Sequence, residues 1–124
     1  MGGQADDRAG RFAVTPPPPY YAVIFTSLLS ADDRGYAAMG EAMFDLALAQ
    51  PGCLGAESAR DAGRLGITVS YWRDEASILA WKRQADHLAA QRYGIERWYA
   101  HYALRVARVE RAYTGPEGRA AGQG

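Results

Sequence analysis

Cysteine, histidine and lysine are scarce in this chain of 124 residues. Its one cysteine, Cys53, rules out an intramolecular disulfide and any metal cluster built on the cysteines of one chain. Its two histidines, His87 and His101, show no regular ligand spacing. Lys82 is its one lysine, so arginine carries nearly all of the basic charge. A disulfide scaffold is therefore excluded, and we expect no bound metal.

Net charge and long apolar runs are also missing. Acidic and basic residues number 14 each, so the basic excess of nucleic-acid-binding proteins is absent. No apolar run approaches the roughly 20 residues that a membrane helix needs. The first residues lack the apolar stretch of a signal peptide. We therefore expect a cytoplasmic protein with no nucleic-acid or membrane partner.

Apolar residues make up 48% of the chain and aromatic residues 11%, enough for one packed domain. Residues 1–19 are rich in Gly, Ala, Asp and Arg and end in four prolines, and residues 114–124 are rich in Gly and Ala. Both ends are predicted to be disordered tails. The domain is predicted to occupy residues 20–113.

Apolar periodicity and turn residues predict six elements within that domain. They are a strand over residues 20–29, a helix from about 33 to 49, strands over 53–59 and 65–72, a helix from 75 to about 98, and a strand over 100–113. Ser30 or Asp32 is expected to cap the first helix, and Asp74 the second. This order is that of a ferredoxin-like α+β fold, βαββαβ, with a four-stranded antiparallel sheet.

Both faces of the first predicted strand are apolar, because Val23 and Phe25 alternate with Ala22 and Ile24. Two helices cover one face of such a sheet and leave the other bare. Monomers rarely expose a large apolar patch. We therefore predict a homodimer in which two sheets pack face to face.

Three motifs lie at residues 20–27, 50–55 and 66–81. They resemble motifs of the antibiotic biosynthesis monooxygenase (ABM) domain family. A Pro-Gly turn after the first helix is typical of the family, as is Tyr71-Trp72 followed by a capped helix that contains Trp81. Residues 86–91 and 97–99 are similar to an uncharacterised bacterial branch. The resemblance covers residues 20–113 and implies a dimeric α+β barrel.

The resemblance leaves the chemistry open, because one fold hosts several functions. Some family members oxidise polycyclic phenols or quinols with dioxygen and use no metal or flavin, since the electron-rich substrate anion itself reduces oxygen. Others degrade haem, and others have no known activity. Haem-degrading members pack a Trp on the porphyrin, as Trp81 would, but their axial His falls here at Gln91 and their first-strand Asn near Thr26. Haem degradation is therefore disfavoured.

The first hypothesis is a cofactor-independent monooxygenase for a small aromatic substrate and dioxygen. His87 would be the base, because histidine titrates near neutral pH, and Arg105 would hold an anion. The substrate pocket is predicted to be lined by Phe25, Ser27, Trp72, Trp81, Gln91 and Tyr102.

Each of these residues also has a structural interpretation. Trp81 would be a core aromatic that joins helix and sheet. His87 would be a polar residue on the exposed face of its helix. Arg105 shares one side of the last strand with His101, and this side points either into the cavity or into the dimer interface. The second hypothesis is accordingly a non-catalytic dimeric module that binds a small apolar ligand.

Overall fold

The computed structural model describes residues 11–32, 35–91 and 98–116, with the side chains of residues 88–91 excepted. The order of its elements confirms the predicted βαββαβ arrangement. They are β1 (Tyr20–Leu29), α1 (Tyr36–Leu48), β2 (Cys53–Arg60), β3 (Leu65–Trp72), α2 (Glu75–Gln91) and β4 (Tyr99–Val109). Neither α1 nor α2 in this described part of the chain is long and apolar enough to cross a membrane.

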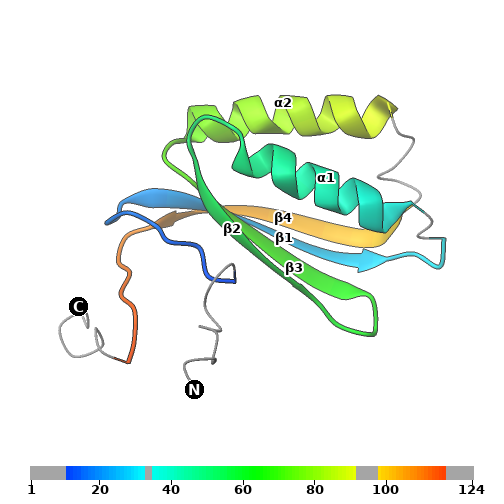
Figure 1. The fold of residues 1–124 in the computed structure, drawn as a ribbon, viewed down its shortest axis with the longest axis horizontal. Helices are drawn as coiled ribbons and strands as arrows, with labels where there is room; N and C mark the ends of the chain where they lie inside the picture. The colour runs from blue at the N-terminus through cyan, green and yellow to red at the C-terminus, as the bar shows by residue number, and fades with distance from the viewer. Residues whose placement is uncertain (1–10, 33–34, 92–97, 117–124) are drawn as a thin grey trace, which may run out of the picture.

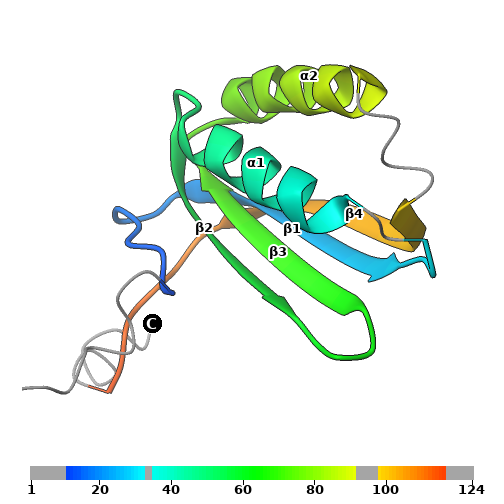
Figure 2. The ribbon, with the colours of Figure 1, turned by 45° about the vertical axis from the view of Figure 1, so that its right-hand side comes forward.

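The four strands form one antiparallel sheet in the order β2-β3-β1-β4. Both helices lie on the same side of this sheet, and the N-terminal segment lies on the other side (Figures 1 and 2). The architecture is therefore the predicted ferredoxin-like one, with β1 and β3 in the middle and β2 and β4 at the edges.

Three predicted boundaries need correction or fall outside the described residues. Helix α1 begins at Tyr36, after Gly35 with a φ of 82° and no side-chain cap, while the Ser30 hydroxyl donates to the carbonyl of Asp32 at 3.1 Å. The predicted start at Asp33 is outside the described residues, as are residues 92–97 of the predicted second helix. Strand β4 ends at Val109 rather than at residue 113, because its partner β1 begins at Tyr20 after four prolines that lack an N–H.

The register defines two faces of the sheet. The helix face carries Val23, Phe25 and Ser27 of β1 and their partners on the neighbouring strands, because directly paired residues point to the same side. The bare face carries the alternate residues, such as Ala22 and Ile24. These assignments confirm the alternation predicted for β1 and for β4.

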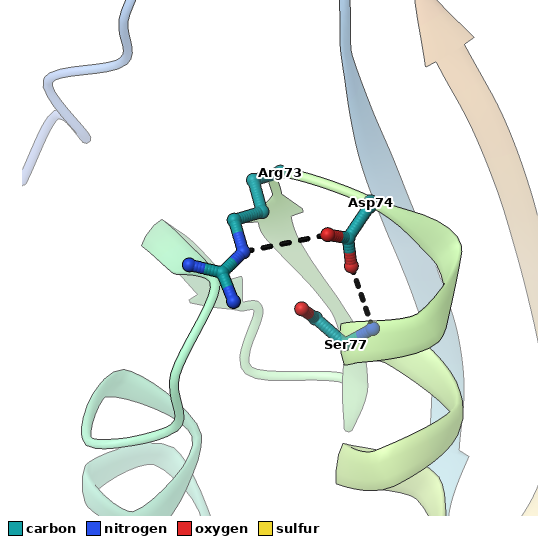
Figure 3. A network of polar contacts seen from close by, with 3 residues as sticks. All are labelled: Arg73, Asp74 and Ser77. Carbon is teal, nitrogen blue, oxygen red and sulfur yellow. Dashed lines mark hydrogen bonds and ion pairs between the residues drawn. The ribbon is translucent and has the colours of Figure 1, made fainter.

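The junction between β3 and α2 holds the second helix over the helix face. Asp74 accepts a hydrogen bond from the N–H of Ser77 at 2.8 Å and lies 3.4 Å from Nε of Arg73 (Figure 3). The predicted N-cap of this helix is therefore confirmed. The adjacent Trp72 is fully buried and stacks on Trp81, with ring centroids 6.3 Å apart.

The N-terminal strap, residues 11–19, lies against the bare face (Figure 1). The N–H of Ala13 donates to a carboxylate oxygen of Glu57 at 3.0 Å, and the hydroxyls of Thr15 and Tyr20 are 3.0 Å apart. Gly55, with a φ of 145°, permits this approach, because a Cβ there would come within 2.9 Å of the Cβ of Ala13. Ala13 and Thr15 of the segment expected to be a tail thus make specific contacts with the sheet, while the domain limits remain a prediction.

Candidate functional site

The helix face is apolar along much of β4 and is not fully covered by the helices. Helix α1 packs on β2 and α2 on β3. On β4 the side chains of Tyr102, Leu104 and Val106 point to the helix face and remain between 47% and 51% exposed. A band of exposed apolar surface therefore lies on the same side of the sheet as the helices.

Aromatic side chains lie beside this band. The ring of Phe25 contacts Tyr102 and Tyr99, with centroid separations of 5.5 and 5.4 Å. Tyr99 in turn meets Tyr36 of α1 edge-on at 5.7 Å, and Tyr36 meets Trp98 at 6.0 Å. These distances are in the favourable range for aromatic pairs. We call Phe25, Tyr36, Trp98, Tyr99 and Tyr102 the aromatic cluster.

The two predicted tryptophans of the pocket form a separate stack. Trp72 is fully buried, and its indole N–H donates to the hydroxyl of Ser70 at 2.8 Å. Trp81 is half-buried against it. Trp72 is thus a core residue, and Trp81 is the member of the pair that a small molecule can reach. The stack supports the interpretation of Trp81 as the residue that joins helix and sheet.

Ser27 is 1% exposed and accepts a hydrogen bond from Nη2 of Arg60 at 2.8 Å. The same nitrogen lies 3.2 Å from the hydroxyl of Tyr36, and the guanidinium carbon is 5.3 Å from the centre of the Tyr36 ring. A guanidinium over an aromatic face is stabilised by the ring quadrupole. Arg60 is therefore part of the site, although it lies one residue beyond the strand predicted over residues 53–59.

Gly66 provides the space for this arginine. It lies on β3 between its partners Arg60 on β2 and Ser27 on β1. A Cβ at Gly66 would lie 2.4 to 2.9 Å from the guanidinium. The arginine side chain therefore crosses the sheet over a glycine, and an isolated glycine in a strand was the sequence signal for this close approach.

Tyr99 remains neutral in this environment. Burial raises the pKa of Tyr99 far above its ordinary value, and its hydrogen bond to the Tyr36 hydroxyl at 3.4 Å acts in the same direction. The positive charge of Arg60 acts against both but does not outweigh them. Tyr99 thus presents a hydroxyl group, rather than a phenolate, to the hydroxyl of Tyr36.

The two predicted catalytic residues do not join this site within one chain. Arg105 pairs with Ile24 and therefore lies on the bare face, as does His101 opposite Leu28. His87 is exposed on α2. It follows Trp81 by six residues, which turns it by roughly 120° around the helix from that ring. The side chain of Gln91 is outside the described residues.

The donor atoms of a metal site do not gather in the described residues either. No group of three or more His, Cys, Asp or Glu side chains there could hold a metal ion. What this part of the chain brings together is an apolar surface, an aromatic cluster and one guanidinium. Such a set can bind a flat aromatic molecule that carries a hydrogen-bond acceptor.

Comparison with known proteins identifies a related family. The model of the family described as "Antibiotic biosynthesis monooxygenase" matches residues 37–93, which span Arg60, Trp72 and Trp81. The uncharacterized protein YqjZ of Bacillus subtilis (strain 168) is 52% identical over 97 residues, which are 78% of this chain and 85% of that protein.

Solved structures share the fold. PA3566 from Pseudomonas aeruginosa superposes with a TM-score of 0.62 at 18% identity, over 76% of this chain and 97% of that one. Rv0793 from Mycobacterium tuberculosis gives a TM-score of 0.60 at 21% identity, over 71% of this chain and 92% of that one. At such identities the likeness concerns the fold, and the chemistry depends on the residues of the site.

Proposed function

Because the chain belongs to the antibiotic biosynthesis monooxygenase family, we propose that it oxidises a small, electron-rich aromatic molecule with dioxygen and needs no metal or flavin. The observation that supports this most directly is the exposed apolar band on β4 beside the aromatic cluster. An aromatic substrate buries apolar area there and stacks against Phe25 and Tyr102.

The reaction balances without an external reductant. A ring CH₂ group that is acidified by a neighbouring phenol or carbonyl loses a proton, and the resulting carbanion transfers electrons to dioxygen. One oxygen atom becomes the new carbonyl, and the other leaves as water with the two hydrogens of the CH₂ group. The substrate thus supplies all four electrons, and the protein has to bind, orient and partly desolvate it.

Named side chains have distinct parts in this proposal. Phe25 and Tyr102 hold the ring, and Leu104 and Val106 keep water from one side of it. Trp81 limits the site at the α2 end. His87, which is exposed on α2, remains the predicted base. The pH profile of a His87→Ala variant tests this role.

The test is oxygen uptake over a panel of phenols, quinols and anthrones. We expect consumption of at least one of them, with one carbonyl formed per dioxygen. Tyr102→Ala and Phe25→Ala should lower kcat/KM by about tenfold, equivalent to ~1.4 kcal/mol of transition-state binding. Arg83→Gln, an exposed change on α2, is the matched control. Turnover that is unchanged in both aromatic variants would rule out this surface as the site.

A non-catalytic binding module is the second candidate. It is favoured by the positions of the predicted base and anion holder, since His87 is exposed on α2 and Arg105 lies on the bare face. It predicts binding of an aromatic ligand with no oxygen uptake. Mass spectrometry of the native protein, followed by oxygen measurement with the co-purified molecule, separates the two candidates.

We also propose a homodimer. Leu28, Leu65 and Ile67 lie on the bare face and are between 39% and 46% exposed, beyond the part that the N-terminal strap contacts. A second copy packed on this face would bury them.

A further inference from the structure

One end of the helix face carries a guanidinium that is held in place but not neutralised. Ser27 and Tyr36 orient Arg60 from two sides, and a third hydrogen bond joins it to the carbonyl of Arg64 in the hairpin. All three acceptors are uncharged. They fix the position of the guanidinium and leave its positive charge uncompensated.

No carboxylate pairs with Arg60 in the described part of the chain. Its sequence neighbour Asp61 is engaged elsewhere, because its Oδ1 accepts the N–H of Leu65 at 2.9 Å. The guanidinium retains N–H donors on Nε and Nη1 for a further acceptor. A fixed guanidinium with free donors is the arrangement that binds planar oxyanions in proteins.

Arg60 is exposed to solvent but lies next to the aromatic cluster, since its guanidinium is over the ring of Tyr36. Its charge acts on Tyr99, whose ring contacts Phe25. The Trp72–Trp81 stack is at the other end of the face, six residues of β1 or roughly 20 Å away. A ring placed against Phe25 would therefore have a positive charge at one edge and apolar side chains at the other.

We propose that Arg60 binds the negatively charged group of the ligand, so that the protein selects aromatic molecules that carry a carboxylate or phenolate on the ring edge. This inference rests on the proposed aromatic site and adds its specificity. Tyr36 and Ser27 are positioning residues, because they act on the ligand through the guanidinium.

Binding of 2-naphthoate and its neutral isostere 2-naphthamide, measured by calorimetry, tests the proposal. We expect Arg60→Gln to lower the affinity for 2-naphthoate about tenfold, since one exposed charge-assisted contact is lost. The affinity for 2-naphthamide should be unchanged. Gly66→Ala should act in the same direction, because its Cβ displaces the guanidinium without removing the charge. Arg83→Gln is the control for net charge. Circular dichroism and melting temperature establish that each variant is folded.

Binding of a phenolate is tested with 4-nitrophenol, because its absorbance reports whether the phenol is ionised. Binding to the wild type should lower its apparent pKa, and Arg60→Gln should abolish the shift. Carboxylate binding without this shift would assign the site to carboxylates.

The anion site would be overturned if Arg60→Gln lowered the affinities for 2-naphthoate and 2-naphthamide equally. It would also be overturned if the wild type did not bind 2-naphthoate. Its failure is distinct from failure of the proposed oxidation. Oxygen uptake with neutral quinols that does not depend on Arg60 would retain the oxidation and refute the anion site. Arg60-dependent binding of 2-naphthoate without oxygen uptake over the panel would retain the anion site and refute the proposed oxidation.

Discussion

On the helix face the exposed apolar side chains are on β4, whereas on the bare face they are on β3 and near the end of β1. The two sets differ in their neighbours. Those on the helix face adjoin an aromatic cluster and an arginine, which suit a ligand. Those on the bare face lie beyond the part that the N-terminal strap contacts, on sheet surface that neither α1 nor α2 covers, which suits a second chain.

The helix face therefore suits ligand binding, and the bare face suits assembly with a second chain. A ligand of limited size needs convergent groups of several kinds, and the helix face provides them from β1, β2, β4 and α1. A protein partner needs a broad surface that is complementary to itself, and a sheet face provides one. Substitutions on the two faces should therefore change different measurements.

The largest expected effect is on the buried stack of the helix face. Trp72→Ala should lower the free energy of unfolding by about 3–5 kcal/mol, because it removes a fully buried ring and leaves a cavity beside Trp81. Tyr102→Ala, on the exposed band, should cost about 1 kcal/mol or less. Urea denaturation measures both. Similar losses for the two would contradict the division between core and binding surface.

The second effect concerns assembly. Ile67→Lys should shift the monomer–dimer equilibrium by at least roughly tenfold toward the monomer, because it buries a charge in the proposed interface. Val106→Lys, with a side chain of similar exposure on the helix face, should leave the dimer intact. Sedimentation equilibrium at micromolar concentration checks this. A wild-type monomer, or dissociation by both variants, would refute an interface on the bare face.

The third effect concerns the N-terminal strap. Glu57 accepts hydrogen bonds from the N–H of Ala13 and, at 2.6 Å, from the hydroxyl of Tyr71. Glu57→Ala should lower the free energy of unfolding by about 1 kcal/mol and increase the rate of hydrogen exchange at the N–H of Ala13. Burial and then the bond to Glu57 raise the pKa of Tyr71, so the variant should lower it toward the ordinary value. Unchanged exchange at Ala13 would show that the strap is held by other contacts.

The smallest effect is the pH dependence of the helix cap. Hydrogen bonds from the hydroxyl and the N–H of Ser77 lower the pKa of Asp74 in the folded state. Its contribution to stability is therefore present above the unfolded pKa of about 3.9 and is lost as pH falls through the lower folded value. Asp74→Asn should flatten that part of the stability profile between about pH 5 and pH 2. Parallel profiles of the two proteins would exclude this linkage.

Much of the fold could be predicted because it depends on local patterns. Alternation placed β1 at Tyr20–Leu29, and the side chain of Asp74 marked the start of α2. The predicted side-chain cap of α1 is not found at Tyr36, where the described helix begins, because Gly35 precedes it in a left-handed conformation without a side-chain cap. A polar residue near a helix start does not reveal where the backbone turns.

The positions of the candidate residues followed only in part from the sequence. Phe25 and Tyr102 lie on the helix face, whereas Trp72 and Ser27 on the same face are buried. Arg60 was missed because its contact with Ser27 joins residues 33 positions apart across an intervening strand. Periodicity does not contain this information.

The sequence by itself determined the elements and the residues that share a side of each strand, because alternation and capping act over a few residues. It grouped His101 with Arg105 but left open which way they point. Only the tertiary structure decided that they lie on the bare face, that β4 stays uncovered, and that Arg60 reaches Ser27 over Gly66. These facts depend on the strand order and on where the helices pack, which are set by burial over the whole chain.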